Sequence, residues 1–157
     1  MNKPLQMPMF KPETEWVPPT HLPDLKDHKE IAIDLETRDP NLMTMGSGSV
    51  RGDGEVIGIA VAVEGWSGYF PINHEGGGNM DRALVLDWFE EVLQTTATKI
   101  FHNAMYDVSW IRSMGFYING GIIDTMIAAS LCNENRWSYT LDSVAKEYIG
   151  VGKSEKL

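Results

Sequence analysis

Two carboxylates follow an apolar run in the segment Ile31–Thr37. Asp34 and Glu36 are two residues apart, so in a β-strand both side chains project from the same face, about 7 Å apart along the chain. Carboxylate oxygens are the hard ligands that Mg²⁺ and Mn²⁺ prefer. A pair of such ions can hold the attacking water and the leaving oxygen during phosphodiester hydrolysis. The two acids therefore indicate a metal-dependent nuclease, with a solvated strand end as the plain structural alternative.

A third carboxylate, Asp107, follows a second apolar segment. The pattern predicts a short strand over 99–102 and a helix from about residue 103 to 114, which places Asp107 in the first helical turn. The helix dipole favours a negative charge there by about 0.3–1 kcal/mol. Parallel pairing of this strand with residues 31–37 would bring Asp107 beside the first two acids. A plain helix-start acid is the alternative.

The net charge of −9 arises from 13 basic and 22 acidic residues among 157. A chain of this length typically forms one domain and buries about 70% of its unfolded surface. Proteins that coat nucleic acid without sequence preference are usually basic, so the charge argues against that class. It is compatible with a metal nuclease, because bound ions supply positive charge locally.

Cysteine content and hydropathy limit the cellular compartments in which the protein is expected. Cys132 is the only cysteine, so we expect no disulfide framework and a cytoplasmic location. No apolar run reaches the roughly 20 residues that cross a bilayer, and prolines interrupt the N-terminus, so we expect neither a membrane span nor a signal peptide. One cysteine and four scattered histidines do not make a structural zinc site.

The first 27 residues contain six of the eight prolines. Without an amphipathic period, they predict an extended arm, which Phe10 and Trp16 could hold against the body. Residues 28–157 form the predicted domain.

Alternation and helical periodicity predict an α/β fold, with a mixed sheet and helices on its faces. A Gly-rich loop over 38–53 follows the strand at 31–37. The further elements expected are strands over 56–63 and 66–72, joined at Glu64–Gly65, a helix over 81–94, the strand over 99–102, the helix over 103–114, a strand over 117–123, and helices over 124–131 and 140–149.

Two of these helices have apolar stripes that indicate a buried face. In the helix over 81–94, capped by Asn79 or Asp81, the stripe consists of Leu84, Val85, Trp88, Phe89, Val92 and Leu93. In the helix over 140–149 it consists of Leu141, Val144, Ala145, Tyr148 and Ile149.

Four segments together resemble one protein family. Ile33–Thr37 is similar to the first motif of the four-acid (DEDD) 3′–5′ exonucleases, and His102–Asp107 is similar to their second motif. The second has the form found in the proofreading domain of family A DNA polymerases, the polymerase I type of bacteria and phages. Ile123–Ala128 and Leu141–Ile149 resemble two further stretches of that domain, in the same order. The resemblance covers about residues 30–157.

The resemblance implies a ribonuclease H-like (DnaQ-like exonuclease) fold with a five-stranded mixed sheet and flanking helices. It implies a 3′–5′ exonuclease that removes the terminal nucleotide of DNA as part of proofreading. Asp34, Glu36 and Asp107 match the catalytic acids that hold two Mg²⁺ or Mn²⁺ ions. The expected partners are the 3′ end of single-stranded DNA and a polymerase portion in the same or a separate chain.

Three other positions match family contacts to the terminal nucleotides, namely Thr37, Asn103 and Tyr106. Each also has a structural alternative, as a strand-end residue, a helix cap and a partly buried aromatic ring respectively. Asp124 and Asp142 are expected to cap helices. The third family motif supplies a fourth Asp and a Tyr beyond the stretch matching 141–149, past Leu157. The alternative function is therefore an inactive module that binds a DNA end or docks onto a polymerase.

Overall fold

The computed structural model describes residues 16–152. Their five strands form a single sheet in the order β3-β2-β1-β4-β5. Antiparallel pairs join β1 to β2 and β2 to β3, whereas β1–β4 and β4–β5 are parallel. The sheet is therefore mixed, as predicted. The strands are β1 (Glu30–Arg38), β2 (Glu55–Val63), β3 (Trp66–Pro71), β4 (Thr98–Phe101) and β5 (Ile122–Asp124).

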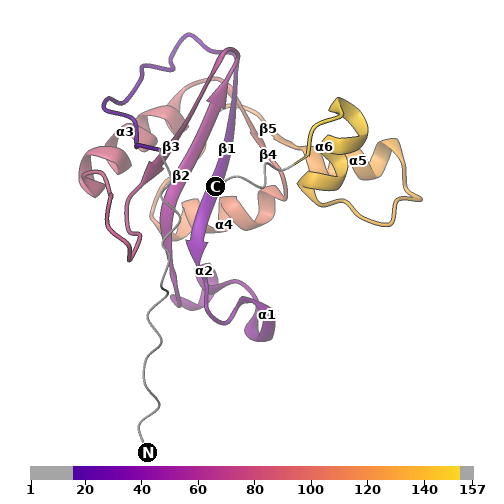
Figure 1. Ribbon diagram of the computed structural model, residues 1–157, viewed down its shortest axis with the longest axis horizontal. Coiled ribbons are helices and arrows are strands. Elements are labelled where there is room, and N and C mark those ends of the chain that lie inside the picture. Colours follow the sequence, from indigo (N-terminus) through magenta and orange to yellow (C-terminus); the bar gives the residue numbers. More distant parts are fainter. Residues whose placement is uncertain (1–15, 153–157) are drawn as a thin grey trace, which may run out of the picture.

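Helices cover the sheet unevenly. Figure 1 shows α3 and α4 on the same face, whereas α5 and α6 lie together beyond the β4–β5 edge and α1 and α2 lie near the end of β1. None of the helices within residues 16–152 is long and apolar enough to cross a membrane. The helices are α1 (Leu42–Met45), α2 (Gly48–Arg51), α3 (Arg82–Gln94), α4 (Ala104–Ser113), α5 (Thr125–Cys132) and α6 (Leu141–Ile149).

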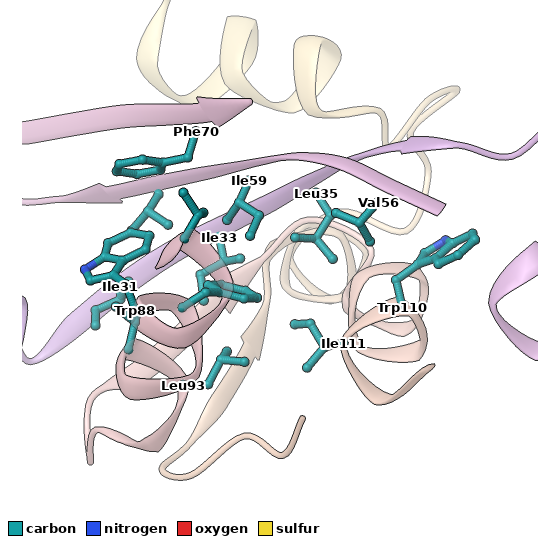
Figure 2. Close-up of a cluster of buried hydrophobic side chains, with 14 of the residues drawn as sticks. Ile31, Ile33, Leu35, Val56, Ile59, Phe70, Trp88, Leu93, Trp110 and Ile111 are labelled. Atoms are coloured by element: carbon teal, nitrogen blue, oxygen red, sulfur yellow. The ribbon is translucent and has the colours of Figure 1, made fainter. Parts of the chain in front are cut away.

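The core lies between the sheet and α3 and α4 (Figure 2). Ile31, Ile33 and Leu35 project into it from β1, while Asp34 and Glu36 are exposed on the opposite face. This alternation confirms the predicted two-faced strand. The α/β architecture places the acid pair on the face away from α3 and α4.

The apolar stripe of α3 is confirmed except at its first residue. Asp81 caps the helix by accepting from the backbone N–H groups of Ala83 and Leu84. Trp88 and Phe89 are buried against the sheet, but Leu84 is 62% exposed, so its predicted burial is wrong. Its neighbour Val85 is buried, so Leu84 lies on the solvent-facing side of the same turn rather than on the face that meets the sheet.

Two segments differ from the prediction. The expected loop over 38–53 contains the short helices α1 and α2. The expected strand over 117–123 is wrong for most of its length, because β5 begins only at Ile122. Gly120 has φ of +80°, and a Cβ there would lie 2.4 Å from the carbonyl oxygen of Ala97, so the chain passes too close to its neighbour for a side chain.

The predicted buried face of the last helix is also wrong. None of the residues of α6 is buried; Leu141 is 54% exposed and Ile149 71%. The helix packs instead around Arg136, whose guanidinium donates to the carbonyl oxygen of Ser143 and lies over the ring of Tyr148.

Part of the proline-rich segment is held against the domain. Residues 16–29 contain neither helix nor strand, yet Leu25 is buried and the carbonyl oxygen of Pro23 accepts from Trp88 Nε1 at 2.7 Å. The ring of Trp16 contacts that of Tyr69. Phe10 lies outside the described residues, and the division of the chain at residue 28 stays a prediction.

Replacing Phe89 with Ala should lower the free energy of unfolding by about 3–5 kcal/mol, because it empties a fully buried position. Leu84→Ala, on the exposed side of the same helix, should change it little. Urea denaturation of both variants measures the difference. Equal losses would contradict the placement of α3.

Candidate functional site

Asp107 lies where β4 stops pairing with β1. The two strands pair only over Glu30–Ala32, so β1 runs on beyond its neighbour. There the Oδ1 atom of Asp107 accepts a hydrogen bond of 2.9 Å from the backbone N–H of Leu35. The carboxylate thus lies against the backbone directly after Asp34. The expected parallel pairing is confirmed, and it brings Asp107 beside β1.

Burial makes this carboxylate unusual. Asp107 is 3% exposed, and desolvation raises its pKa to about 6, with the charge of Asp34 acting in the same direction. The Leu35 N–H opposes the shift by stabilising the ionised form. At neutral pH the group carries a charge that is costly to bury, and a bound cation would relieve that cost.

Asp34 and Glu36 project from the exposed face of β1, opposite Ala60 and Gly58 of β2. With Asp107 they offer oxygen donors only, which fits Mg²⁺ or Mn²⁺. Within residues 16–152, however, no three His, Cys, Asp or Glu side chains are gathered closely enough to hold an ion as they stand. These carboxylates therefore offer the oxygen ligands that Mg²⁺ and Mn²⁺ prefer, but as they stand they are not close enough together to hold an ion.

Two of the three proposed nucleotide contacts meet at the end of β1. The hydroxyls of Thr37 and Tyr106 lie 2.7 Å apart, and Tyr106 precedes Asp107 on α4. This contact joins the first two sequence motifs directly. The hydroxyls could therefore act on a substrate, but their mutual hydrogen bond also serves the fold.

Asn103 begins α4 without capping it through its side chain. Its φ of +72° is left-handed, and its side chain makes no cap hydrogen bond, so the helix-cap alternative is wrong. The backbone N–H groups of Asn103 and Ala104 donate to Asp124 instead. The Asn103 side chain is exposed, and its left-handed backbone conformation is one that asparagine adopts more readily than most residues.

Asp124 is confirmed as a cap and serves two helices. It also accepts from Met126 at the start of α5. Burial alone would raise its pKa, but its backbone N–H donors outweigh burial, and its pKa is lowered. Asp142 is not a cap, since Thr140 occupies that position of α6 and Asp142 pairs with Lys146.

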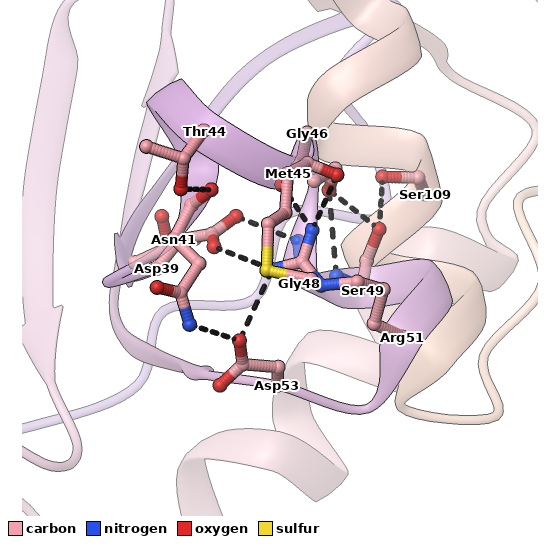
Figure 3. A network of polar contacts seen from close by, with 12 residues as sticks. Asp39, Asn41, Thr44, Met45, Gly46, Gly48, Ser49, Arg51, Asp53 and Ser109 are labelled. Carbon is pink, nitrogen blue, oxygen red and sulfur yellow. Dashed lines mark hydrogen bonds and ion pairs between the residues drawn. The ribbon is translucent and has the colours of Figure 1, made fainter.

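The loop after β1 is fixed by Asp39, a residue that sequence reasoning missed (Figure 3). Its side chain is 2% exposed, and one oxygen lies 3.7 Å from Arg51 Nη2. The other oxygen accepts from the backbone N–H of Gly48 at 2.8 Å and lies 3.5 Å from the Tyr106 hydroxyl. Asp39 therefore ties the loop to the Thr37–Tyr106 pair. A polar residue in a Gly-rich loop gives no sequence signal for such burial.

A cavity of about 540 Å³ lies beside Asp34 on the exposed sheet face. Asp34, Tyr69 and His102 contribute polar groups to its lining, which is otherwise mainly apolar. Sequence reasoning assigned His102 no structural role, yet its two ring nitrogens contact Thr125 Oγ1 and the carbonyl oxygen of Tyr139. The ring thereby joins the end of β4 to α5 and the loop before α6.

Comparison with known proteins decides the family. The model of a 3′–5′ exonuclease domain of the DNA polymerase A type matches residues 20–157. The chain belongs to this family. Members of the family generally depend on divalent metal ions.

Two phage polymerases are similar to this 3′–5′ exonuclease domain. A DNA-directed DNA polymerase of Pseudomonas phage M6 is 35% identical over 98% of the chain and 24% of its own length. The DNA polymerase DpoZ of Salmonella phage PMBT28 is 30% identical over 86% of the chain and 19% of its own length. The chain thus spans about a quarter or less of these relatives.

A solved structure supports the fold. Brucella melitensis NrnC with bound Mg²⁺ superposes with a TM-score of 0.60 at 21% identity, over 84% of this chain and 59% of that one. The ribonuclease H-like architecture expected for the exonuclease domain is confirmed.

Asp107→Asn should flatten the pH dependence of stability in the metal-free exonuclease domain. A pKa of about 6 against an ordinary 3.8 means that the folded state binds this proton more tightly. Its stabilising contribution is complete below about pH 4 and is lost as the pH rises through about 6, by at most about 3 kcal/mol. Asn lacks that loss and can still accept from Leu35. Urea unfolding in EDTA from pH 4 to pH 7 measures both proteins, and parallel curves would contradict the assignment. Calorimetry should also show weaker Mn²⁺ binding by the variant.

Asp39→Ala should lower the free energy of unfolding by about 1–3 kcal/mol, because it leaves the backbone N–H of Gly48 without its carboxylate acceptor and removes one ion-pair partner of Arg51. Asp53→Ala removes a more exposed carboxylate from the same loop and should have a much smaller effect. Thermal and urea denaturation of the two variants compare them. A larger loss in Asp53→Ala would refute the anchoring role of Asp39.

Proposed function

We propose that this chain is the 3′–5′ exonuclease region of a family A-like DNA polymerase. It would hydrolyse the 3′-terminal phosphodiester of DNA and release nucleoside monophosphates during proofreading. The hydrogen bond from Leu35 to Asp107 carries this proposal, because it brings the acids of the first two family motifs to one place. The match over residues 20–157 supports the reaction class.

The proposed roles follow from position. Asp34, Glu36 and Asp107 would hold Mg²⁺ or Mn²⁺, which when bound lowers the pKa of water and neutralises the leaving oxygen. Thr37 and Tyr106 would orient the terminal nucleotide, since their paired hydroxyls lie at the end of the strand that carries the acids. The exposed side chain of Asn103 would contact the same nucleotide.

The substrate and partners are inferred from the relatives and the charge. A net charge of −9 suits a protein that meets DNA at a local site rather than along a broad surface. The proposed substrate is the 3′ end of a single strand, delivered by a polymerase portion in the same or a separate chain. The cytoplasm, where DNA is copied, is the proposed location.

Incubation of the protein with 5′-labelled single-stranded DNA and Mn²⁺ or Mg²⁺ should shorten the strand from its 3′ end. Asp34→Ala should slow this by at least about 100-fold, because small displacements of metals or water have effects of that size. Asp24→Ala, which removes an exposed acid of the N-terminal segment, is the matched control.

The products are resolved on a sequencing gel, with an RNA strand of the same sequence alongside. Metal-dependent binding of the DNA without any cleavage would refute the enzyme and favour the docking module. Faster removal of nucleotides from the RNA would refute the choice of substrate.

A further inference from the structure

Tyr69 lies on β3, two strands from the acid pair of β1, and contacts His74; neither residue belongs to a family motif. In the sheet, Asp34 pairs with Ala60 and Ala60 pairs with Tyr69. Directly paired residues project from the same face, so Tyr69 shares the exposed face of Asp34. Tyr69 and Asp34 also line the same cavity.

A missing side chain at Gly58 lets the tyrosine ring reach toward Glu36. Gly58 pairs with Glu36 on β1. A Cβ on this glycine would lie 1.9 Å from the Tyr69 hydroxyl, so the phenol occupies the space above the glycine. The hydroxyl is therefore one strand away from the Glu36 position. Burial, and then the charges of Glu36 and Asp34, raise the pKa of Tyr69 to about 12, as expected for a buried phenol close to two carboxylates.

His74 holds the hydroxyl from the other side. Its Nε2 atom lies 2.5 Å from the Tyr69 oxygen. The histidine backbone is fixed by Asn79, which accepts from the His74 N–H at 2.7 Å and donates to its carbonyl oxygen at 2.9 Å. An ion pair between Arg38 and Glu75 ties the same loop to the end of β1. The imidazole is thus placed by the fold.

The neighbouring charges decide the direction of this hydrogen bond. If Tyr69 donated to His74, the lone pairs of the phenol oxygen would face two carboxylates. If His74 donates from Nε2–H, the hydroxyl proton is free to turn toward those carboxylates, which attract it. The second arrangement therefore leaves the phenol with a donor to offer on the side of the carboxylates.

We propose that His74 and Tyr69 form a positioning relay, in which Nε2–H of His74 donates to the phenol oxygen and the hydroxyl holds a water molecule against the Glu36 carboxylate. A single water can bridge two groups that do not meet directly. The relay fixes Glu36 in the orientation needed to bind a metal ion, as groups that hydrogen-bond metal ligands do. This inference rests on the proposed metal site.

The first test reads the histidine directly. Long-range ¹H–¹⁵N NMR of the metal-free protein with neutral imidazole rings should show the proton of His74 on Nε2. A proton on Nδ1 would overturn the relay without bearing on the proposed exonuclease activity.

The second test measures Mn²⁺ affinity by calorimetry. Tyr69→Phe keeps the ring and should weaken binding about tenfold, whereas Tyr117→Phe, which removes an exposed hydroxyl, should not. His74→Gln retains an N–H donor and should preserve much of the affinity, while His74→Leu should match Tyr69→Phe. This ordering separates positioning from mere packing.

The outcomes are distinguishable from those of the proposed function. Loss of Mn²⁺ binding in Asp34→Ala together with unchanged binding in Tyr69→Phe overturns the relay alone. Binding that survives Asp34→Ala overturns the metal site, and the relay with it.

Discussion

The hydrogen bond between the Leu35 N–H and Asp107 is the constraint on which the site depends. A strand that outruns its neighbour leaves backbone donors unpaired, and burying such a donor costs about 1–3 kcal/mol. Here a side chain from the following helix replaces the missing strand. The same contact that completes the sheet therefore sets a carboxylate beside Asp34, so fold and chemistry share one interaction.

A second carboxylate, Asp124, fixes the position of the helix that carries Asp107. Asp124, at the end of β5, accepts from the first residues of both α4 and α5. It fixes where α4 begins, and Asp107 lies three residues later than Ala104 along that helix. Parallel pairing of β4 with both β1 and β5 brings these strand ends together. Asp107 and Asp124 thus accept hydrogen bonds from backbone N–H groups, whereas Asp34 and Glu36 are exposed.

Much of this arrangement follows from local sequence pattern. Alternation in β1 places Ile33 and Asp34 on opposite faces, and the apolar stripe on α3 identifies Phe89 as a core residue. Both patterns can be read locally, because the backbone geometry of strands and helices fixes the direction of each side chain. What the pattern missed depends on distant segments. Gly120 breaks its expected strand because the backbone of Ala97 approaches it. Asp39 is buried because a loop folds back over it.

Lys99 illustrates the same limit. On β4 its side chain is fully buried, and its ammonium group donates to the carbonyl oxygens of Thr95 and Asn119. Burial lowers its pKa. Lysine side chains are almost always exposed, so the residue type alone would predict a surface position. Only the meeting of the end of α3 with the segment before β5 supplies the oxygens that make this burial tolerable.

The apolar surface around Asp34 would strengthen the attraction between the exposed acids and a cation. Ala32, Ala60 and Ala62 line the cavity beside it, and small apolar residues exclude water without crowding the carboxylates. Because attraction between charges grows as the local dielectric constant falls, a cation there would be held more firmly than at an ordinary solvated strand end. The same surroundings would make the unneutralised acids repel one another. A polar donor at the margin of this surface, such as the Tyr69 hydroxyl, would ease that repulsion before any ion arrives.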